Sequence, residues 1–326
     1  MKICIVGAGA VGGLFAAWLA PRHELSVLAR GATLQALRAQ GLRWQIGDAE
    51  LQTVGVAASD DVKRLGPHDA VVLAVKGPAL PAVAPAVRVL SHANTQVLVA
   101  MNGVPWWFFD GLGGPCDGMR LDATDPGGAI ARCIPTSQVI GCVVHLSSTT
   151  PEPGVVRLGK GNGLIIGEPA GGSSERTHAW QAMLDEAGFA TTVSPRIQQD
   201  IWFKLWGNMT MNPISALTLA TGDRVLDDPL VRAFTNAVML EARSIGNAIG
   251  IPIVQEPEER HVVTRKLGAF KTSMLQDVEA GRPIELDALV GSVREIGVRL
   301  GLATPNIDAL LGLTRLLGQQ RGLYPR

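Results

Sequence analysis

The stretch that decides the fold stands at the N-terminus and reads Lys2-Ile3-Cys4-Ile5-Val6-Gly7-Ala8-Gly9-Ala10-Val11-Gly12. A short apolar run, then glycines spaced G-x-G-x-x-G, then the helical segment 14–20 predict a strand, a tight turn and a helix that bind a dinucleotide. In this interpretation Gly7 permits the turn, Gly9 lets the backbone approach a pyrophosphate, and Gly12 lets helix and strand pack closely. The pyrophosphate would accept hydrogen bonds from N–H groups at the helix start. The expected binding residues are Gly7, Ala8, Gly9, Ala10, Val11 and Gly12.

The residue after the next predicted strand indicates which dinucleotide is bound. Segment 24–29 is typical of a strand, and Arg30 follows it directly. NAD-binding domains usually place an Asp or Glu at this strand end to hold the ribose 2′-hydroxyl. A guanidinium would instead pair with a 2′-phosphate. The sequence therefore predicts NADP(H) as the cofactor, although a solvated surface arginine is the alternative interpretation of Arg30.

The composition is typical of a globular enzyme. The 326 residues are 47% hydrophobic, and 29 basic side chains balance 29 acidic ones. No long basic block points to nucleic acid, and no apolar run has transmembrane length or a signal-peptide pattern, so neither a nucleic-acid partner nor a membrane is expected. Cys4, Cys116, Cys133 and Cys142 have no metal-ligand spacing, so no metal is expected. A reduced cytoplasm is the expected compartment.

The first half of the chain alternates buried strands and helices. Apolar runs of the kind found in strands covered on both faces occur at Val71–Val75 and Gln96–Ala100, and another strand is expected at Val139–Leu146. Gly159-Lys160-Gly161-Asn162-Gly163 predicts a hairpin turn between Val155–Leu158 and Leu164–Gly167. A helix over Ser174–Ala187 and a strand near Ala190–Val193 follow. This half predicts a Rossmann-type doubly wound domain, extended by antiparallel strands.

From Arg196 onward helical periodicity replaces the strand signals. Helices are expected at Gln198–Met211, Pro229–Ile249, Arg260–Glu279, Pro283–Leu300 and Ile307–Gln319, with breaks at Pro213, Gly250, Gly281 and Gly301. The predicted fold is α/β, with an NADP-binding Rossmann-type domain at 1–195 and an all-helical substrate domain at 196–326. The substrate is expected between the two domains.

A polar stripe runs along the first helix of the predicted second domain. Lys204, Asn208 and Asn212 are spaced i, i+4 and i+8, so they share one helix face. The flanking residues are mostly Trp, Phe, Leu and Met, and Asn is a poor former of helix interiors. A solvent-facing stripe is the simpler interpretation, but the apolar surroundings favour a function.

Two further polar residues stand out downstream. Ser273 lies in a helix that ends before Gly281, and Glu285 follows Pro283. The first turn of the next helix would hold Glu285, where the helix dipole favours a negative charge. An ordinary first-turn Glu is the commoner explanation of such a residue.

At this point the chain resembles the ketopantoate reductases (2-dehydropantoate 2-reductases) over nearly its whole length. The matching motifs are Gly7–Gly12, Arg30, Lys76 after the strand 71–75, Asn102-Gly103, Trp202-x-Lys204-x-x-x-Asn208-x-x-x-Asn212-Pro213, Ser273-Met274 and Glu285-Leu286-Asp287.

The resemblance implies a role for each of these residues. Arg30 and Lys76 would contact the adenosine 2′-phosphate end of NADPH, and Asn102 would lie near the nicotinamide ribose and the substrate. Lys204 would be the general acid. The substrate oxygens would be held by Asn208, Asn212 and Ser273. Glu285 would pair with Lys204 and would also lie at the cofactor. A protonated lysine is a suitable partner for the alkoxide that hydride transfer creates at a ketone.

One segment departs from the family pattern. Asn102 is preceded by Met101 where Gln is common, and Trp106-Trp107-Phe108-Phe109 begins a longer, more aromatic stretch. Packing or a subunit contact is one interpretation of these aromatic side chains, and a reshaped wall beside the nicotinamide is the other.

The function expected from the sequence is NADPH-dependent reduction of a 2-keto acid, most of all of 2-dehydropantoate to (R)-pantoate in pantothenate biosynthesis. Another NADP-dependent 2-keto or 3-hydroxy acid dehydrogenase is an alternative. The β-hydroxyacid dehydrogenases, however, place a glycine-rich turn before their lysine, where this chain has Gln199–Phe203. A non-catalytic NADP(H) sensor would not need both Lys204 and Glu285. A homodimer is left open.

Overall fold

The first strand, β1 (Lys2–Val6), lies inside a ten-stranded sheet and is buried from Ile3 to Val6. In this computed structural model, which describes residues 1–325, six strands pair in parallel in the order β5-β2-β1-β6-β7-β8. Numbered by their sequence order among these six, they run 3-2-1-4-5-6, which is the order of doubly wound dinucleotide-binding sheets. The order reverses between β1 and β6, and such sheets bind their ligands outside the carboxyl ends of the strands at that reversal.

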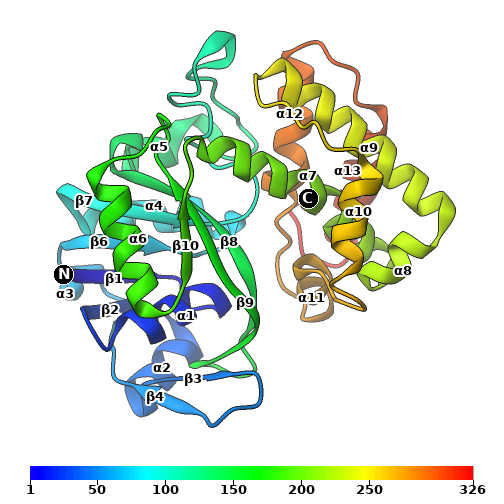
Figure 1. Ribbon diagram of the computed structural model, residues 1–326. Helices are drawn as coiled ribbons and strands as arrows, with labels where there is room; N and C mark the ends of the chain where they lie inside the picture. The colour runs from blue at the N-terminus through cyan, green and yellow to red at the C-terminus, as the bar shows by residue number, and fades with distance from the viewer. Residues whose placement is uncertain (326) are drawn as a thin grey trace. The chain divides into compact units, whose positions relative to one another are not determined.

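The remaining strands extend this sheet at the β8 edge (Figure 1). β9 is antiparallel to β8, β3 and β10 pair in parallel with β9, and β4 is antiparallel to β3. The strands after β1 are β2 (Glu24–Leu28), β3 (Leu42–Ile46), β4 (Gln52–Val54), β5 (Ala57–Ser59), β6 (His68–Leu73), β7 (Ser91–Ala100), β8 (Val139–Thr149), β9 (Val155–Gly167) and β10 (Ala190–Val193).

Helices connect these strands. They are α1 (Ala10–Leu19), α2 (Gly31–Gln40), α3 (Val62–Leu65), α4 (Leu80–Val89), α5 (Ala129–Cys133) and α6 (Glu175–Ala187), with short 3₁₀ turns η1 (Gly77–Ala79), η3 (Pro126–Gly128) and η4 (Thr136–Gln138). Ser174 caps α6 by accepting a hydrogen bond from the Thr177 N–H, and Gly188, at φ 112°, ends the helix. The predicted helix at Ser174–Ala187 is therefore confirmed.

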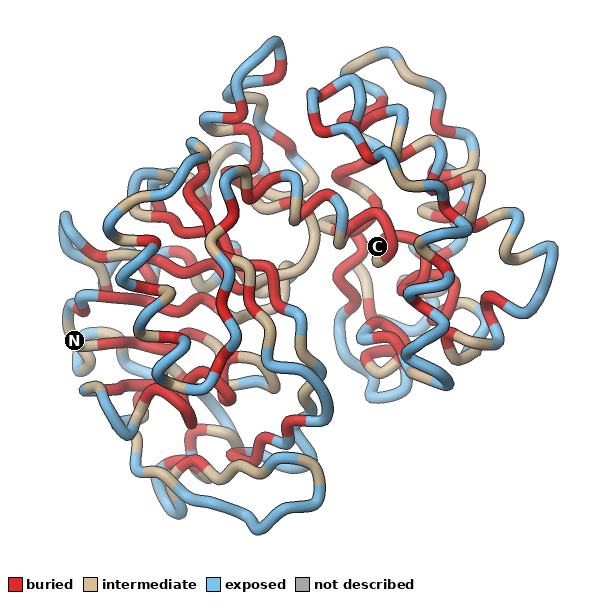
Figure 2. Tube along the Cα trace, in the orientation of Figure 1, coloured by how far each residue is buried: buried red, intermediate tan, exposed pale blue. Residues whose placement is uncertain are grey.

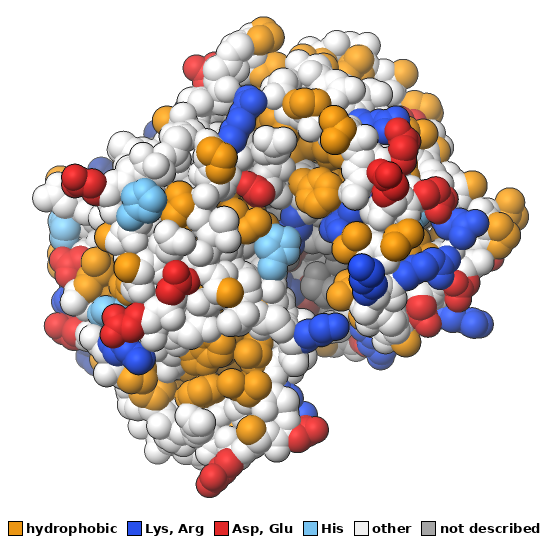
Figure 3. Space-filling model, in the orientation of Figure 1, with side chains coloured by type: hydrophobic (Ala, Val, Ile, Leu, Met, Phe, Trp, Pro, Cys, Tyr) orange, Lys and Arg blue, Asp and Glu red, His pale blue; other side chains and the backbone are white. Residues whose placement is uncertain are grey.

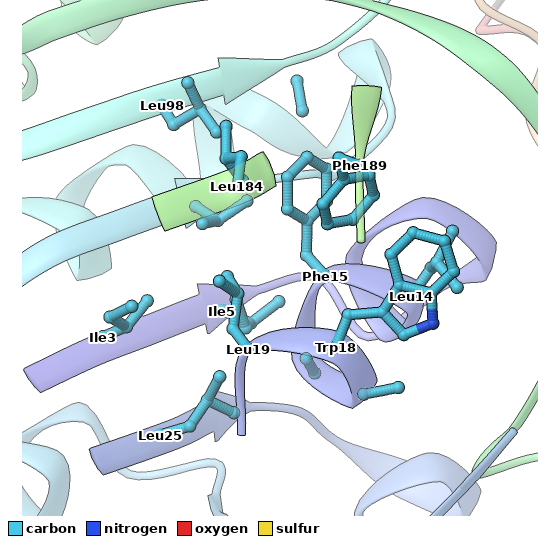
Figure 4. Packing of buried hydrophobic residues seen from close by; sticks show 14 of the residues in the cluster. Ile3, Ile5, Leu14, Phe15, Trp18, Leu19, Leu25, Leu98, Leu184 and Phe189 are labelled. Carbon is cyan, nitrogen blue, oxygen red and sulfur yellow. The ribbon is translucent and has the colours of Figure 1, made fainter. Parts of the chain in front are cut away.

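The core of this sheet unit forms where α1 packs on the strands. Phe15 stacks on Phe189 with ring centroids 4.8 Å apart, and Trp18 lies 4.5 Å from the same ring (Figure 4). Figure 2 shows the central strands β1 and β6 as largely buried, as expected of a sheet with helices on its faces. This packing holds the turn between β1 and α1 in a fixed place.

The second unit is helical. Its elements are α7 (Ile197–Thr218), α8 (Gly222–Asp227), α9 (Pro229–Ala248), α10 (Pro257–Arg265), α11 (Ser273–Glu279), the π-helical turn η5 (Asp287–Gly291), α12 (Ser292–Arg299), α13 (Pro305–Gln320) and the 3₁₀ turn η2 (Gly114–Cys116). Helix α9 is central, because it packs against α8, α10, α12 and α13.

The two compact units of the structure differ from the predicted division into domains 1–195 and 196–326, because each unit consists of several segments of the chain. Unit 1 comprises 1–101, 110–112 and 128–200, and unit 2 comprises 102–109, 113–127 and 201–326. The aromatic side chains of 106–109 explain part of this difference, because they are buried and Phe108 packs on Trp202, with ring centroids 6.0 Å apart. Asn102 therefore belongs to the same unit as Lys204.

The hairpin predicted at Gly159–Gly163 is wrong. β9 runs unbroken from Val155 to Gly167, and the register opposite β8 shifts where His145 faces Gly163 and Ser147 faces Lys160. Gly161 has φ 76°, and a Cβ on it would lie 2.8 Å from the His145 carbonyl oxygen. The glycines form a β-bulge rather than a turn.

The break predicted at Pro213 is also wrong, because α7 continues through it to Thr218. Proline removes one N–H from the helix ladder. Asn212, the residue before Pro213, adds a side-chain hydrogen bond in this part of the helix, because its amide donates to the Asn208 carbonyl at 3.0 Å. Burial of the helix from Leu205 to Met211 on several faces holds the remaining turns.

Two predicted helices are interrupted. The helix expected at Arg260–Glu279 is split into α10 and α11, because Gly268 takes φ 69° and Thr272 caps α11 through the Leu275 N–H. The helix expected at Pro283–Leu300 begins only after Glu285, and its first turn is the π-helical η5. The short helix α8 was not predicted.

Candidate active site

The turn after β1 is rich in glycine, and close packing requires two of its glycines to lack a side chain. Gly7 has φ 99°, and a Cβ on it would lie 2.7 Å from the Ala74 carbonyl oxygen. A Cβ on Gly12 would lie 2.0 Å from the Gly7 oxygen, so neither position accepts another residue without a shift. By contrast, nothing lies within 4 Å of a Cβ on Gly9, which is exposed. The backbone is therefore open at the one glycine where a phosphate group would approach.

The N-terminus of α1 faces this opening without a capping side chain. Its N-cap is Gly9, and its first turn contains no acidic residue. Uncapped N–H groups and the helix dipole together favour an anion there. The residues at this end of the sheet therefore fit a dinucleotide pyrophosphate.

Arg30 and Lys76 follow the two strands that flank β1. Arg30 is exposed at the N-cap of α2, and within residues 1–325 its guanidinium makes no hydrogen bond or ion pair. Lys76 is half-buried, lies a few residues beyond the end of β6 and directly precedes η1. Because β2, β1 and β6 are parallel neighbours, both residues lie at the same edge of the sheet as the glycine turn. Their placement suits contact with the phosphates of a dinucleotide.

The polar stripe of α7 begins with a contact to Asn102. The Lys204 Nζ donates a hydrogen bond of 2.8 Å to the Asn102 Oδ1, and both side chains are half-buried. Asn102 is held in place by its neighbours, since Gly103 has φ 83° and the Val104 N–H donates to the Ala288 carbonyl at 2.9 Å. A Cβ on Gly103 would lie 2.4 Å from that same carbonyl oxygen. The lysine therefore has a fixed partner from a segment far away in the sequence.

Asn212 joins two helices. Its Oδ1 accepts hydrogen bonds from the Ser273 hydroxyl at 3.1 Å and from the Met274 N–H at 3.3 Å, and its side chain is buried. Because its amide nitrogen donates to the Asn208 carbonyl, Asn212 fastens the start of α11 to α7. Ser273 itself is exposed, and Asn208 is half-buried on the same stripe as Lys204.

Glu285 lies one position before the helical residues rather than in the first helical turn, and it is 7% exposed. The chain around it is bound on both sides by residues near the C-terminus. Ile284 donates its N–H to the Leu323 carbonyl at 3.1 Å, and the Tyr324 hydroxyl donates to the Asp287 carboxylate at 2.5 Å. Burial raises the pKa of Asp287, and the hydrogen bond from Tyr324 opposes that rise. The pairing of Glu285 with Lys204 stays a prediction.

Sequence reasoning did not single out Tyr324 as a supporting residue of this segment. Its only signal was that it is the one tyrosine in the chain.

The aromatic segment after Asn102 is packed rather than free. Trp106, Trp107, Phe108 and Phe109 are each 3% exposed or less. Their burial matches the packing interpretation of this stretch.

The site residues described above can offer a small ligand the amine of Lys204, the hydroxyl of Ser273 and the side-chain amides of Asn102 and Asn208. Within residues 1–325, no group of three His, Cys, Asp or Glu side chains is placed to hold a metal ion. In the same range no helix is long and apolar enough to cross a membrane. Figure 3 shows basic and acidic side chains interspersed on the visible face of each unit.

Comparison with known proteins identifies the family. The model "Ketopantoate reductase PanE/ApbA" matches residues 3–106, and "Ketopantoate reductase PanE/ApbA C terminal" matches residues 196–318. A 2-dehydropantoate 2-reductase of Mesorhizobium japonicum is 45% identical over 99% of this chain and 100% of its own length. The chain belongs to the ketopantoate reductase family.

Solved structures of ketopantoate reductases share the fold. A protein of Ralstonia solanacearum MolK2 that has been assigned as a ketopantoate reductase is 58% identical, with a TM-score of 0.95 over 99% of both chains. The PanE/ApbA family ketopantoate reductase of Ralstonia eutropha JMP134 is 26% identical, with a TM-score of 0.84 over 99% of this chain and 100% of its own. The α/β fold with a helical C-terminal unit, predicted from the sequence, is confirmed.

Proposed function

We propose that this ketopantoate reductase reduces 2-dehydropantoate to (R)-pantoate with NADPH. The observation that carries the proposal is the Lys204–Asn102 hydrogen bond of 2.8 Å, which fixes the Lys204 amine on the stripe that also bears Asn208. The full-length similarity to a 2-dehydropantoate 2-reductase supports the choice of substrate.

The cofactor would be held by unit 1. The open backbone at Gly9 and the uncapped start of α1 suit the pyrophosphate, and the unpartnered guanidinium of Arg30 suits the 2′-phosphate. When bound, NADPH supplies a hydride to the ketone carbon. A carboxylate at the position of Arg30 would favour NAD instead.

The residues of unit 2 would handle the oxygen of the ketone. As the carbon gains the hydride, the oxygen becomes an alkoxide and takes a proton from the Lys204 Nζ. Asn102 keeps the Nζ in place, and the buried Glu285 would pair with Lys204 and keep the amine protonated. Asn208 and Ser273 offer groups that can hydrogen-bond the substrate carboxylate or its terminal hydroxyl. Asn212 would act mainly by holding Ser273.

The product belongs to pantothenate biosynthesis, and we place the enzyme in the cytoplasm. Cys4, Cys116, Cys133 and Cys142 are thiols rather than disulfides, which agrees with a reducing compartment. A homodimer stays a prediction.

Steady-state assays with two substrates test the proposal. Ketopantoate should be reduced with a higher kcat/KM than 2-keto-isovalerate, which lacks the hydroxymethyl group, because a site built to hydrogen-bond a hydroxyl rejects the analogue without it. NADPH consumption with each acid gives the ratio. Equal or better turnover of a bulkier, hydroxyl-free 2-keto acid would reject pantoate as the product while leaving the reductase activity in place.

A further inference from the structure

Arg260 packs its guanidinium directly onto helix α7. The residue lies on α10, and its Cζ is 5.1 Å from the centroid of the Phe203 ring. A Cβ on Gly207 would lie 3.3 Å from the Arg260 Nε and 3.4 Å from one terminal nitrogen. The absence of a side chain at Gly207 therefore makes room for the guanidinium against the helix.

This guanidinium has no anion within residues 1–325. It makes no hydrogen bond or ion pair there, and its Nε is buried without a partner. The neighbouring arginines are paired, since Arg265 contacts Asp227 at 2.6 Å and Arg243 contacts Glu256 at 2.8 Å. Leaving a buried donor unpaired is costly, and more so when it is charged.

The acidic residues of α10 are engaged elsewhere. Glu256 pairs with Arg243, Glu258 accepts from Asn236 and lies 3.6 Å from Arg232, and Glu259 accepts from the Glu256 N–H. Burial lowers the pKa of Arg260, which is the direction expected of a cation without a nearby carboxylate. The carboxylates of Glu256, Glu258 and Glu259 are therefore close to Arg260 in the sequence, but none of them pairs with its guanidinium.

The position of Gly207 places Arg260 beside the polar stripe. Gly207 is three residues after Lys204 and directly precedes Asn208. Residues three apart on a helix are surface neighbours, with Cβ positions about 5–6 Å apart. A cation lying on Gly207 is thus next to the lysine that would protonate the substrate oxygen.

We propose that Arg260 binds the carboxylate of the 2-keto acid substrate, a role that rests on the proposed function. In such an acid the carboxylate is attached to the carbon that carries the ketone. Its receptor must therefore lie close to Lys204. Lys204 is assigned to the ketone oxygen, and the ligand groups on Asn102, Asn208 and Ser273 are uncharged. Arg260 therefore supplies the positive charge for the carboxylate, which selects an acid over a neutral ketone.

The decisive experiment compares ketopantoate with its methyl ester. Arg260→Met should raise KM for the acid about tenfold to a hundredfold, because a hydrogen bond to a charged group is lost, with little change for the ester. Arg260→Lys keeps a positive charge but not the planar guanidinium, so its KM for the acid should lie between that of the unmodified enzyme and that of Arg260→Met. Arg265→Met is the matched control on the same helix and should leave both substrates unchanged. Added guanidinium should partly restore the acid reaction of Arg260→Met.

A second variant reaches the same contact from α7. Gly207→Ala keeps the charge but pushes the guanidinium away, and should raise KM for the acid more than for the ester. If both variants raised KM for the acid and for the ester by the same factor, the role of Arg260 would be packing alone. That result would overturn the proposal.

Failure of the proposed function can be told apart from failure of this inference. If the unmodified protein does not reduce ketopantoate, calorimetric titration with oxamate in the presence of NADPH replaces the assay. Binding of oxamate that is lost in Arg260→Met supports the carboxylate site without pantoate as product. Absent binding, or equal binding by both proteins, overturns it.

Discussion

The guanidinium of Arg30 is exposed and has no partner within residues 1–325, and the residue lies just beyond the end of β2, the strand beside β1. We expect Arg30→Ala to raise KM for NADPH about tenfold to a hundredfold with little change in kcat, because it removes binding far from the reacting atoms. Arg22→Ala is the matched control, since Arg22 is an exposed arginine of the same unit that pairs with Glu186. KM measurements with NADPH and NADH check the prediction. Equal affinity of the unmodified enzyme for both cofactors would contradict it.

The lysine of the α7 stripe has a different signature. Lys204→Ala should lower kcat by roughly 10²–10⁴, the usual contribution of a general acid, while the NADPH Kd stays nearly unchanged. Glu285→Ala should also slow the reaction, and the double variant should lose less than the product of the two single effects. Lys271→Ala, which removes a surface lysine paired with Glu279, should have no effect. Near-normal turnover of Lys204→Ala would mean that the stripe is structural.

At the residue scale the sequence predicted which polar side chains of α7 share a helix face, but not which partners they contact. The spacing of Lys204, Asn208 and Asn212 follows directly from helix geometry. The commitment of Asn212 to Ser273 and Met274 does not, because it depends on where α11 meets α7. Arg260 carried no signal, since its neighbour Gly207 comes more than fifty residues earlier in the chain.

Asn212 on α7 accepts two hydrogen bonds from the start of α11. Asn212→Ala would leave the buried Met274 N–H without its partner, at a cost of about 1–3 kcal/mol in the free energy of unfolding. It should also lower kcat/KM, because Ser273 loses the acceptor that orients it. Urea unfolding and substrate kinetics measure the two effects.

Ser273→Ala is the control for this junction. It keeps the backbone contact of Met274 with Asn212, so it should lower kcat/KM with a smaller loss of stability. Equal stability losses in the two variants would show that Asn212 does not carry the junction.

Elements with local signals were predicted well, and those set by distant partners were not. Helix α6 has its cap and its terminating glycine within its own sequence. The glycines of β9 look the same in sequence as a hairpin turn, and only pairing with β8 and β3 shows that they form a bulge. Similarly, Pro213 does not end α7, because the helix is buried on both sides of it.

Each unit buries one histidine whose protonation opposes folding. Burial lowers the pKa of His68, as does Lys2, and burial lowers the pKa of His261 against the opposing effect of Glu258. Below the ordinary value of 6.5 the unfolded chain therefore binds more protons than the folded one. We expect the free energy of unfolding to fall as the pH drops from 7.5 to 5.5.

Urea unfolding at several pH values measures this dependence, in a window above that in which ordinary carboxyl groups titrate. His68→Gln removes the titrating ring and should flatten the dependence, even if the loss of the 2.6 Å contact with Ser26 lowers overall stability. An unchanged slope in that variant would assign the effect to other groups.

The discontinuity of unit 2 has a consequence for biosynthesis. The aromatic side chains of 106–109 are buried in that unit, yet they leave the ribosome roughly a hundred residues before Trp202, which at about 5–20 residues per second is roughly 5–20 s. During that interval the strands of unit 1 can already pair. The two tryptophans and two phenylalanines of 106–109 stay exposed, because α7, which packs on them through Trp202, has not yet been synthesised. This nascent segment is where a chaperone would bind and where aggregation during overexpression would begin, and slower translation of residues 110–200 would lengthen its exposure.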